Sequence, residues 1–198
     1  HYPLRRQRQM CIRDSLYIAP GFFDPQVNGF AGVDFNDKDL LPEDLHRAAH
    51  AISATGVTTF FPTLITTSFE RLICQLKILK EAIEKDLLVS NMCKGIHLEG
   101  PYISSNEGPR GVHSPKFIRS PRWEEFESFQ EACGGRISLI TLAPEREGGL
   151  DFIEKAVSKG VVVAIGHTEA SEDVLEASFK AGAKLSTHLG NGIGTLLS

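Results

Sequence analysis

Several short segments of this chain are apolar on consecutive residues, and this pattern constrains the fold more than any other feature of the sequence. VVVAIG (161–166) is one of them. A strand that is apolar on both faces must be covered on both faces, whereas a strand with one wet face alternates apolar and polar residues. The sequence therefore predicts a buried, parallel β-sheet.

Amphipathic segments alternate with these strands from Leu16 onward. The expected strands cover residues 18–24, 57–65, 94–100, 137–144, 161–167 and 184–190. The expected helices cover residues 41–56, 67–85, 123–132, 150–158 and 171–182. We expect a capping box of Thr67 and Glu70 to open the second helix. An open doubly wound sheet and an incomplete β/α barrel both fit this alternation, and periodicity alone does not choose between them.

The composition narrows the class of protein. The chain has 198 residues, 41% of them hydrophobic, and a formal net charge of −4, which provides no basic face for nucleic acid or for anionic lipid. The four cysteines have no CxxC spacing and fit a reducing compartment. We therefore expect a cytoplasmic protein that acts on a small molecule and binds neither nucleic acid nor a membrane.

Residues 1–15 differ from the rest of the sequence. HYPLRRQRQMCIRDS is rich in arginine and has no apolar periodicity. We expect this segment to be a non-native or disordered leader outside the fold, and residues 16–198 to form the folded domain. A native basic tail is the alternative.

Polar residues follow several of the expected strands. Gln26 and Asn28 follow the first, Glu99 ends the third, His167 ends the fifth and His188 the sixth. In a parallel β/α architecture, the carboxyl ends of all strands lie on one face. Two imidazoles and one carboxylate are the ligand set of an open catalytic metal site. A bound metal lowers the pKa of water from 15.7 toward ~7, so the pattern indicates hydrolysis of an amide or ester.

Structural roles compete with this interpretation. A histidine at a strand end can be a hydrogen-bonded core residue, and Glu99 could accept backbone N–H groups or pair with Arg110. His97 shares a strand face with Glu99 and could be a fourth ligand or a supporting residue behind the site. His113, in a glycine-flanked loop, could reach a substrate or face solvent.

Six motifs carry a resemblance to a known family. They are APGFFDPQVNG, ATGVTTFFPTLIT, GIHLEGPYIS, RGVHSP, AIGHTEA and STHLGNG. In this order and at these separations the sequence resembles the N-acetylglucosamine-6-phosphate deacetylases of the amidohydrolase superfamily, over about residues 16–192. The resemblance implies a metal-dependent TIM-type (β/α) barrel. The chain would hold about six of the eight strands and lack most of the accessory β-sandwich, and the parent protein would be a homodimer.

The resemblance also assigns roles to residues. It places metal ligation on Glu99, His167 and His188. Many relatives carry His-x-His where this chain has Gln26 and Asn28, so we expect one divalent ion, zinc or iron, rather than two. The substrate contacts that it implies are Val112, His113, Asn191 and Gly192, and the residues expected on the site wall are Gln26, Asn28 and His97.

The resemblance implies that the parent protein removes the acetyl group from N-acetylglucosamine 6-phosphate, giving glucosamine 6-phosphate and acetate in amino-sugar catabolism. The aspartate that carries the proton in relatives is expected beyond Ser198, so we expect no general acid–base within this chain and little activity of the segment alone. The turn HLGNGI, from His188, departs from the family pattern. Two alternatives stay open: an amidohydrolase acting on a different N-acyl or cyclic amide, and a metal-free sugar-phosphate binding protein.

Overall fold

The core of the fold is one parallel β-sheet. The structure, a computed structural model, describes residues 19–191. Six strands pair in chain order, and every neighbouring pair is parallel: β1 (Phe22–Val27), β4 (Val57–Ile65), β5 (Ile96–Glu99), β6 (Ile137–Leu142), β7 (Val162–Ile165) and β8 (Leu185–Ser186). The prediction of a parallel sheet is confirmed.

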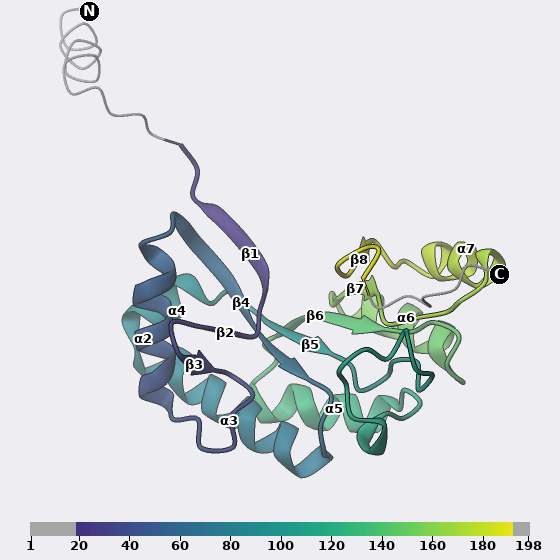
Figure 1. Cartoon of the computed structure of the whole chain (residues 1–198), viewed down its shortest axis with the longest axis horizontal. Coiled ribbons are helices and arrows are strands. Elements are labelled where there is room, and N and C mark those ends of the chain that lie inside the picture. The colour runs from purple at the N-terminus through teal and green to yellow at the C-terminus, as the bar shows by residue number, and fades with distance from the viewer. Residues whose placement is uncertain (1–18, 192–198) are drawn as a thin grey trace, which may run out of the picture.

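Helices connect successive strands: α2 (Pro42–Ser53), α3 (Phe69–Lys85), α4 (Leu87–Met92), α5 (Trp123–Ala132), α6 (Gly149–Ser158) and α7 (Glu172–Lys180). The sheet curves, and α2, α3 and α5 lie along its outer side (Figure 1). A doubly wound sheet would reverse its strand order part-way and carry helices on both faces. Consecutive order with an outer helical layer is that of a β/α barrel, so the fold is an incomplete TIM-type barrel. None of the helices in the described range is long and apolar enough to cross a membrane.

The structure contains all the predicted strands and helices, together with short elements that were not predicted. These are the antiparallel pair β2 (Gly29–Phe30) and β3 (Val33–Asp34), the helix α4, and a 3-10 turn at Pro115–Phe117. Elements of two or three residues are too short to show a hydrophobic period, and α4 follows α3 almost directly. Asp86 marks that boundary, because its side chain accepts a hydrogen bond from Val89 N at 2.9 Å.

The first strand differs from its predicted bounds of 18–24. β1 runs from Phe22 to Val27 and includes Pro25, while Ile18 lies outside the described residues. Proline is tolerated because, within the described sheet, β1 is an edge strand that pairs with β4 alone. Gln26 therefore lies inside the strand rather than after it.

The predicted capping box at Thr67 is wrong. The N-cap of α3 is Ser68, whose hydroxyl accepts a hydrogen bond from Arg71 N at 3.2 Å. Since the helix begins at Phe69, Glu70 is the second helical residue, and a capping box needs a glutamate at the third.

A buried hydrogen-bonded chain crosses the inner side of the sheet. His97 Nδ1 donates to the carbonyl oxygen of Pro25 at 3.1 Å, and its Nε2 accepts from the Thr141 hydroxyl at 2.7 Å. Thr141 in turn accepts from the hydroxyl of Thr187 at 2.6 Å. Burial lowers the pKa of His97 to about 4, against the opposing effect of the Glu99 charge, so the ring is neutral and joins β1 to β6 and to the end of β8.

We predict that Thr141→Val destabilises the protein by about 1–3 kcal/mol, because the nearly isosteric change leaves His97 Nε2 buried without its donor. The matched control is Thr58→Val on the exposed side of β4. Urea unfolding of both variants and the wild type measures the difference. Equal midpoints for the two variants would show that the interior chain contributes nothing to stability.

Candidate metal centre

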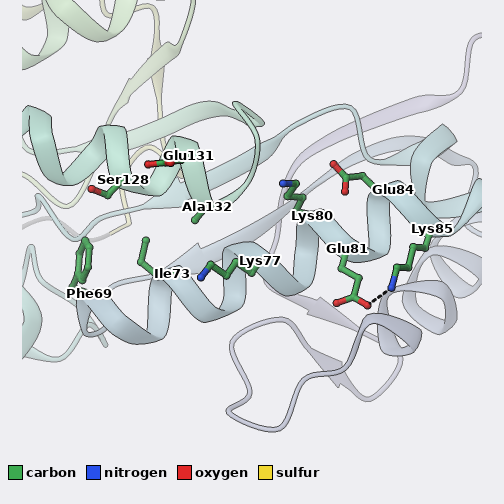
Figure 2. A pocket seen from close by; sticks show the side chains of 10 residues that line it. All are labelled: Phe69, Ile73, Lys77, Lys80, Glu81, Glu84, Lys85, Ser128, Glu131 and Ala132. Atoms are coloured by element: carbon green, nitrogen blue, oxygen red, sulfur yellow. Dashed lines mark hydrogen bonds and ion pairs between the residues drawn. The ribbon is translucent and has the colours of Figure 1, made fainter.

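The polar ends of the strands surround a cavity of about 630 Å³. Its lining residues are Gln26, Asn28, Asp34, Asn36, Ile65, Glu99, Gly108, Gly111, Val112, His113, His167, His188 and Asn191. A larger hollow of about 770 Å³ lies on the outer side, between α3 and α5, among lysine and glutamate side chains and without a histidine (Figure 2). Of these two hollows, only the 630 Å³ cavity gathers Glu99 and the histidine side chains, so it is the candidate site.

Glu99 is the centre of this site. It is the last residue of β5, and Gly100 follows it with a φ of +83°, a left-handed turn suited to glycine. The carboxylate is buried, and its Oε1 lies 3.1 Å from His167 Nε2 and 3.0 Å from His188 Nε2. Both predicted histidine ligands therefore lie against the Glu99 carboxylate, although 89 positions separate Glu99 from His188 along the chain. His188 is not among the donor atoms that lie within 4.8 Å of one another, which are those of Glu99, His113 and His167.

Two of these residues have unusual backbone conformations. His167 and His188 follow β7 and β8 with φ values of 51° and 30°. A positive φ is uncommon for a residue other than glycine, and such strain gathers at functional sites. The turns hold both imidazoles toward Glu99.

Backbone carbonyl groups fix the orientation of both rings. His167 Nδ1 donates to the carbonyl oxygen of Pro109 at 2.8 Å, and His188 Nδ1 donates to that of Asn191 at 3.2 Å. A carbonyl oxygen only accepts, so Nδ1 carries a hydrogen in each ring and Nε2 is the ring nitrogen that faces the Glu99 carboxylate. Ligating histidines adopt this arrangement in metal sites.

A third imidazole enters the same site from the loop after β5. His113 Nε2 lies 3.2 Å from His167 Nε2, and its Nδ1 lies 2.9 Å from the hydroxyl of Thr66. Donor atoms of Glu99, His113 and His167 all lie within 4.8 Å of one another. The sequence placed His113 against a substrate, whereas the structure also places it among the donors.

Burial and hydrogen bonding set the charges of the site. Burial alone would raise the pKa of Glu99, but hydrogen bonds to His167 and His188 outweigh it and hold the pKa at about 2. Burial and the neighbouring His167 lower the pKa of His113 to about 4. Burial also opposes protonation of His167, but its hydrogen bonds to Glu99 and Pro109 raise its pKa. An ionised oxygen among imidazole nitrogens is a donor set suited to zinc or another divalent transition metal.

Several proteins named N-acetylglucosamine-6-phosphate deacetylase match most of this chain. It is 34% identical over 181 residues to the N-acetylglucosamine-6-phosphate deacetylase of Haemophilus influenzae, covering 91% of this chain and 45% of that enzyme. It is 36% identical over 187 residues to the enzyme of the same name from Caenorhabditis elegans, covering 91% and 44%. A solved structure of a single-residue mutant of the Mycobacterium smegmatis deacetylase matches with a TM-score of 0.78 and 36% sequence identity. That structure holds N-acetyl-D-glucosamine-6-phosphate, and the match covers 89% of this chain and 44% of that enzyme.

Over most of its length the chain is similar to N-acetylglucosamine-6-phosphate deacetylases. The solved structure of the N-acetylglucosamine-6-phosphate deacetylase from Pasteurella multocida is also similar, with a TM-score of 0.77 and 34% sequence identity. The match covers 87% of this chain and 44% of that enzyme. No protein-family model matches the sequence. The chain spans less than half the length of these relatives.

Of the residues expected on the site wall, Gln26 and Asn28 line the cavity. Of the expected substrate contacts, Val112, His113 and Asn191 line it. Gly192 lies outside the described residues. His97 does not line the cavity within the described range; both its ring nitrogens are hydrogen-bonded behind Glu99.

The alternative ion pair of Glu99 with Arg110 does not occur. Arg110 instead donates to the carbonyl oxygen of His113 at 3.1 Å and braces the loop, while Glu99 pairs with His167 and His188. Glu99 therefore pairs with the two candidate metal-ligating histidines and not with Arg110.

Two lining residues, Asp34 and Asn36, were missed from the sequence. Asn36 spans two backbone groups of β4: it donates to the Thr63 carbonyl oxygen at 3.0 Å and accepts from Ile65 N at 2.9 Å. These bonds hold the segment after β3 at the cavity rim. No local pattern marks a two-residue strand, so the sequence offered no signal for either residue.

We predict that Glu99→Gln abolishes stoichiometric metal binding, because it removes the negative donor and leaves the imidazole nitrogens without a counter-charge for the cation. Elemental analysis after dialysis is expected to find about one transition-metal ion per wild-type chain and a small fraction of that in the variant. Glu127→Gln, an exposed change on α5, is the matched control. Equal metal content in the two variants would contradict the assigned centre.

Proposed function

We propose that this chain supplies the metal-binding part of an N-acetylglucosamine-6-phosphate deacetylase. The enzyme would hydrolyse the acetamide of N-acetylglucosamine 6-phosphate to glucosamine 6-phosphate and acetate. One observation carries the proposal: Glu99, His167 and His188 converge at the ends of three strands in a chain related to these deacetylases. A metal site of this kind suits amide hydrolysis, because the carbonyl group is a poor electrophile and water a poor nucleophile, and a metal ion improves both.

Glu99, His167 and His188 would hold one divalent ion, zinc or iron. When bound, such an ion lowers the pKa of a coordinated water toward ~7 and polarises the amide carbonyl group. The protein's part is to hold the donors. The bonds from Nδ1 to the carbonyl groups of Pro109 and Asn191 keep the Nε2 lone pairs aimed at the site, and the Glu99 carboxylate offsets part of the positive charge.

A single ion is favoured over a pair. Gln26 and Asn28 occupy the part of the cavity wall where many relatives have histidines. Their amides are neutral and bind zinc poorly in comparison with imidazole or carboxylate groups. They are better suited to hydrogen bonds with sugar hydroxyl groups.

The substrate would lie in the cavity against Val112, His113, Asn191 and Gly192. The hydroxyl and amide groups of a sugar need hydrogen-bonding partners, which the polar lining supplies. We assign no general acid–base among the lining residues. The proton that the leaving amine requires would come from an aspartate in residues after Ser198.

We propose the cytoplasm as the location, a homodimer as the assembly, and residues 16–198 as the part of the chain that forms the barrel. The described cysteines Cys74, Cys93 and Cys133 are free thiols, which fits a reducing compartment.

A second candidate is an amidohydrolase acting on a different N-acyl or cyclic amide. The turn after His188 favours it. Leu189 is 87% exposed and Gly190 has no side chain, so this wall of the cavity provides little contact for a sugar phosphate. Substrate profiling separates the two candidates.

We predict that His188→Asn lowers the rate of acetate release from N-acetylglucosamine 6-phosphate by at least about 100-fold, because carbonyl polarisation is lost with the metal. The assay uses the protein encoded by the complete reading frame, loaded with zinc or iron. His50→Asn, an exposed change on α2, is the control and is expected to keep full activity.

Two outcomes would contradict the proposal. Turnover of another N-acyl or cyclic amide, with none of N-acetylglucosamine 6-phosphate, would support the second candidate. A wild-type protein that binds the sugar phosphate without metal and without turnover would be a binding protein.

A further inference from the structure

Glu145, in the loop between β6 and α6, binds the turn that follows His167. Thr168 Oγ1 donates a hydrogen bond to Glu145 Oε2 at 2.5 Å, and Glu169 N donates to Glu145 Oε1 at 3.0 Å. Hydrogen bonds to an ionised carboxylate are stronger than those between neutral groups. Both oxygen atoms of one side chain therefore bind the two residues directly after a candidate metal ligand.

This turn needs support because its first residue has an unfavourable backbone conformation. The φ of His167 is 51°, in the left-handed region that a residue with a side chain seldom adopts. Conformations of this kind persist only where the surrounding structure fixes them. The Thr168 hydroxyl also accepts from Ala170 N at 3.0 Å, so Glu145 holds a turn that is itself closed by a hydrogen bond.

The same turn is bound by the loops after β5 and β6. From the loop after β5, Ser104 N donates to the His167 carbonyl oxygen at 2.9 Å, and Asn106 Nδ2 donates to Glu169 Oε1. From the loop after β6, Glu145 accepts the two hydrogen bonds described above. Contacts from two separate loops therefore hold the backbone around His167.

Glu145 reaches the candidate site through this turn and not by direct contact. Among the described residues that line the 630 Å³ cavity, Glu145 is absent. It borders instead a separate hollow of about 300 Å³ beside the start of α6. Any effect of this carboxylate on the site must therefore pass through the residues that it binds.

We propose that Glu145 is a positioning residue for His167. Its carboxylate acts through the hydroxyl and backbone N–H groups of the next two residues. It keeps the His167 ring beside Glu99, where Nε2 lies 3.1 Å from the carboxylate Oε1. The proposal rests on the metal centre of the proposed function, because His167 is one of its candidate ligands. Without these bonds, the His167 backbone relaxes toward a negative φ and turns Nε2 away from Glu99.

Cobalt binding by the protein encoded by the complete reading frame tests this with paired variants. Thr168→Val removes the hydroxyl with little change of shape, whereas Thr168→Ser keeps it. We expect the Co²⁺ dissociation constant to rise by about 10–100-fold in Thr168→Val, the loss typical when a group that orients a ligand is removed. The visible absorption bands of bound Co²⁺ shift in that variant, and Thr168→Ser restores both properties.

Glu145→Ala removes both acceptors at once. Its matched control is Glu147→Ala, an exposed change two positions along the same loop. The first is expected to weaken Co²⁺ binding at least as much as Thr168→Val, and the second to match the wild type. Urea unfolding of the metal-free proteins measures any loss of stability separately. If Glu145→Ala does not fold, the two Thr168 variants decide the test.

Unchanged Co²⁺ affinity and spectrum in Thr168→Val would overturn the proposal, even with a lower urea midpoint, because the contact would then serve stability alone. Equal losses in Thr168→Ser and Thr168→Val, or a wild-type protein that binds no Co²⁺, would also overturn it. A wild type that binds Co²⁺ but releases no acetate from N-acetylglucosamine 6-phosphate would contradict the proposed function and not the positioning role. Turnover by the wild type, with unchanged Co²⁺ binding in Thr168→Val, would show the reverse.

Discussion

The buried carboxylate of Glu99 is the constraint on which the rest of the site depends. A charge removed from water costs several kcal/mol unless partners compensate for it. Here the partners come from the turns after β7 and β8, at 3.1 and 3.0 Å. The sheet must therefore hold these strand ends at a fixed distance from β5.

Beneath this cluster, a second polar layer fixes the strands in register. His97 points to the same side of β5 as Glu99, two residues away, and joins the Pro25 carbonyl group to the hydroxyl of Thr141. Thr187, bonded to Thr141, directly precedes His188. The position of a candidate ligand thus depends on a hydrogen-bonded chain that starts at the opposite edge of the described sheet. These hydrogen-bonded side chains inside the barrel support a site at the carboxyl ends of the strands. Loops supply the remaining contacts there.

The loop after β5 adds what the strands do not provide. Pro109 orients His167 and His113 joins the donors, while Arg110 braces the loop from its own segment. Binding residues are often carried on loops that a rigid scaffold positions.

The sequence by itself determined the order and type of the main elements and indicated three candidate metal ligands. Apolar runs and helical periods are local, and parallel strands must bring their carboxyl ends together, so Glu99, His167 and His188 could be placed at one site from the sequence alone. The choice of a barrel over a doubly wound sheet came from family resemblance, and the structure confirmed it through the strand order. Only the tertiary structure decided the bounds of β1, the support given by His97, the lining by Asp34 and the place of His113 among the donors. Each of these depends on which backbone groups lie opposite one another in space, and no local spacing of residue types encodes that.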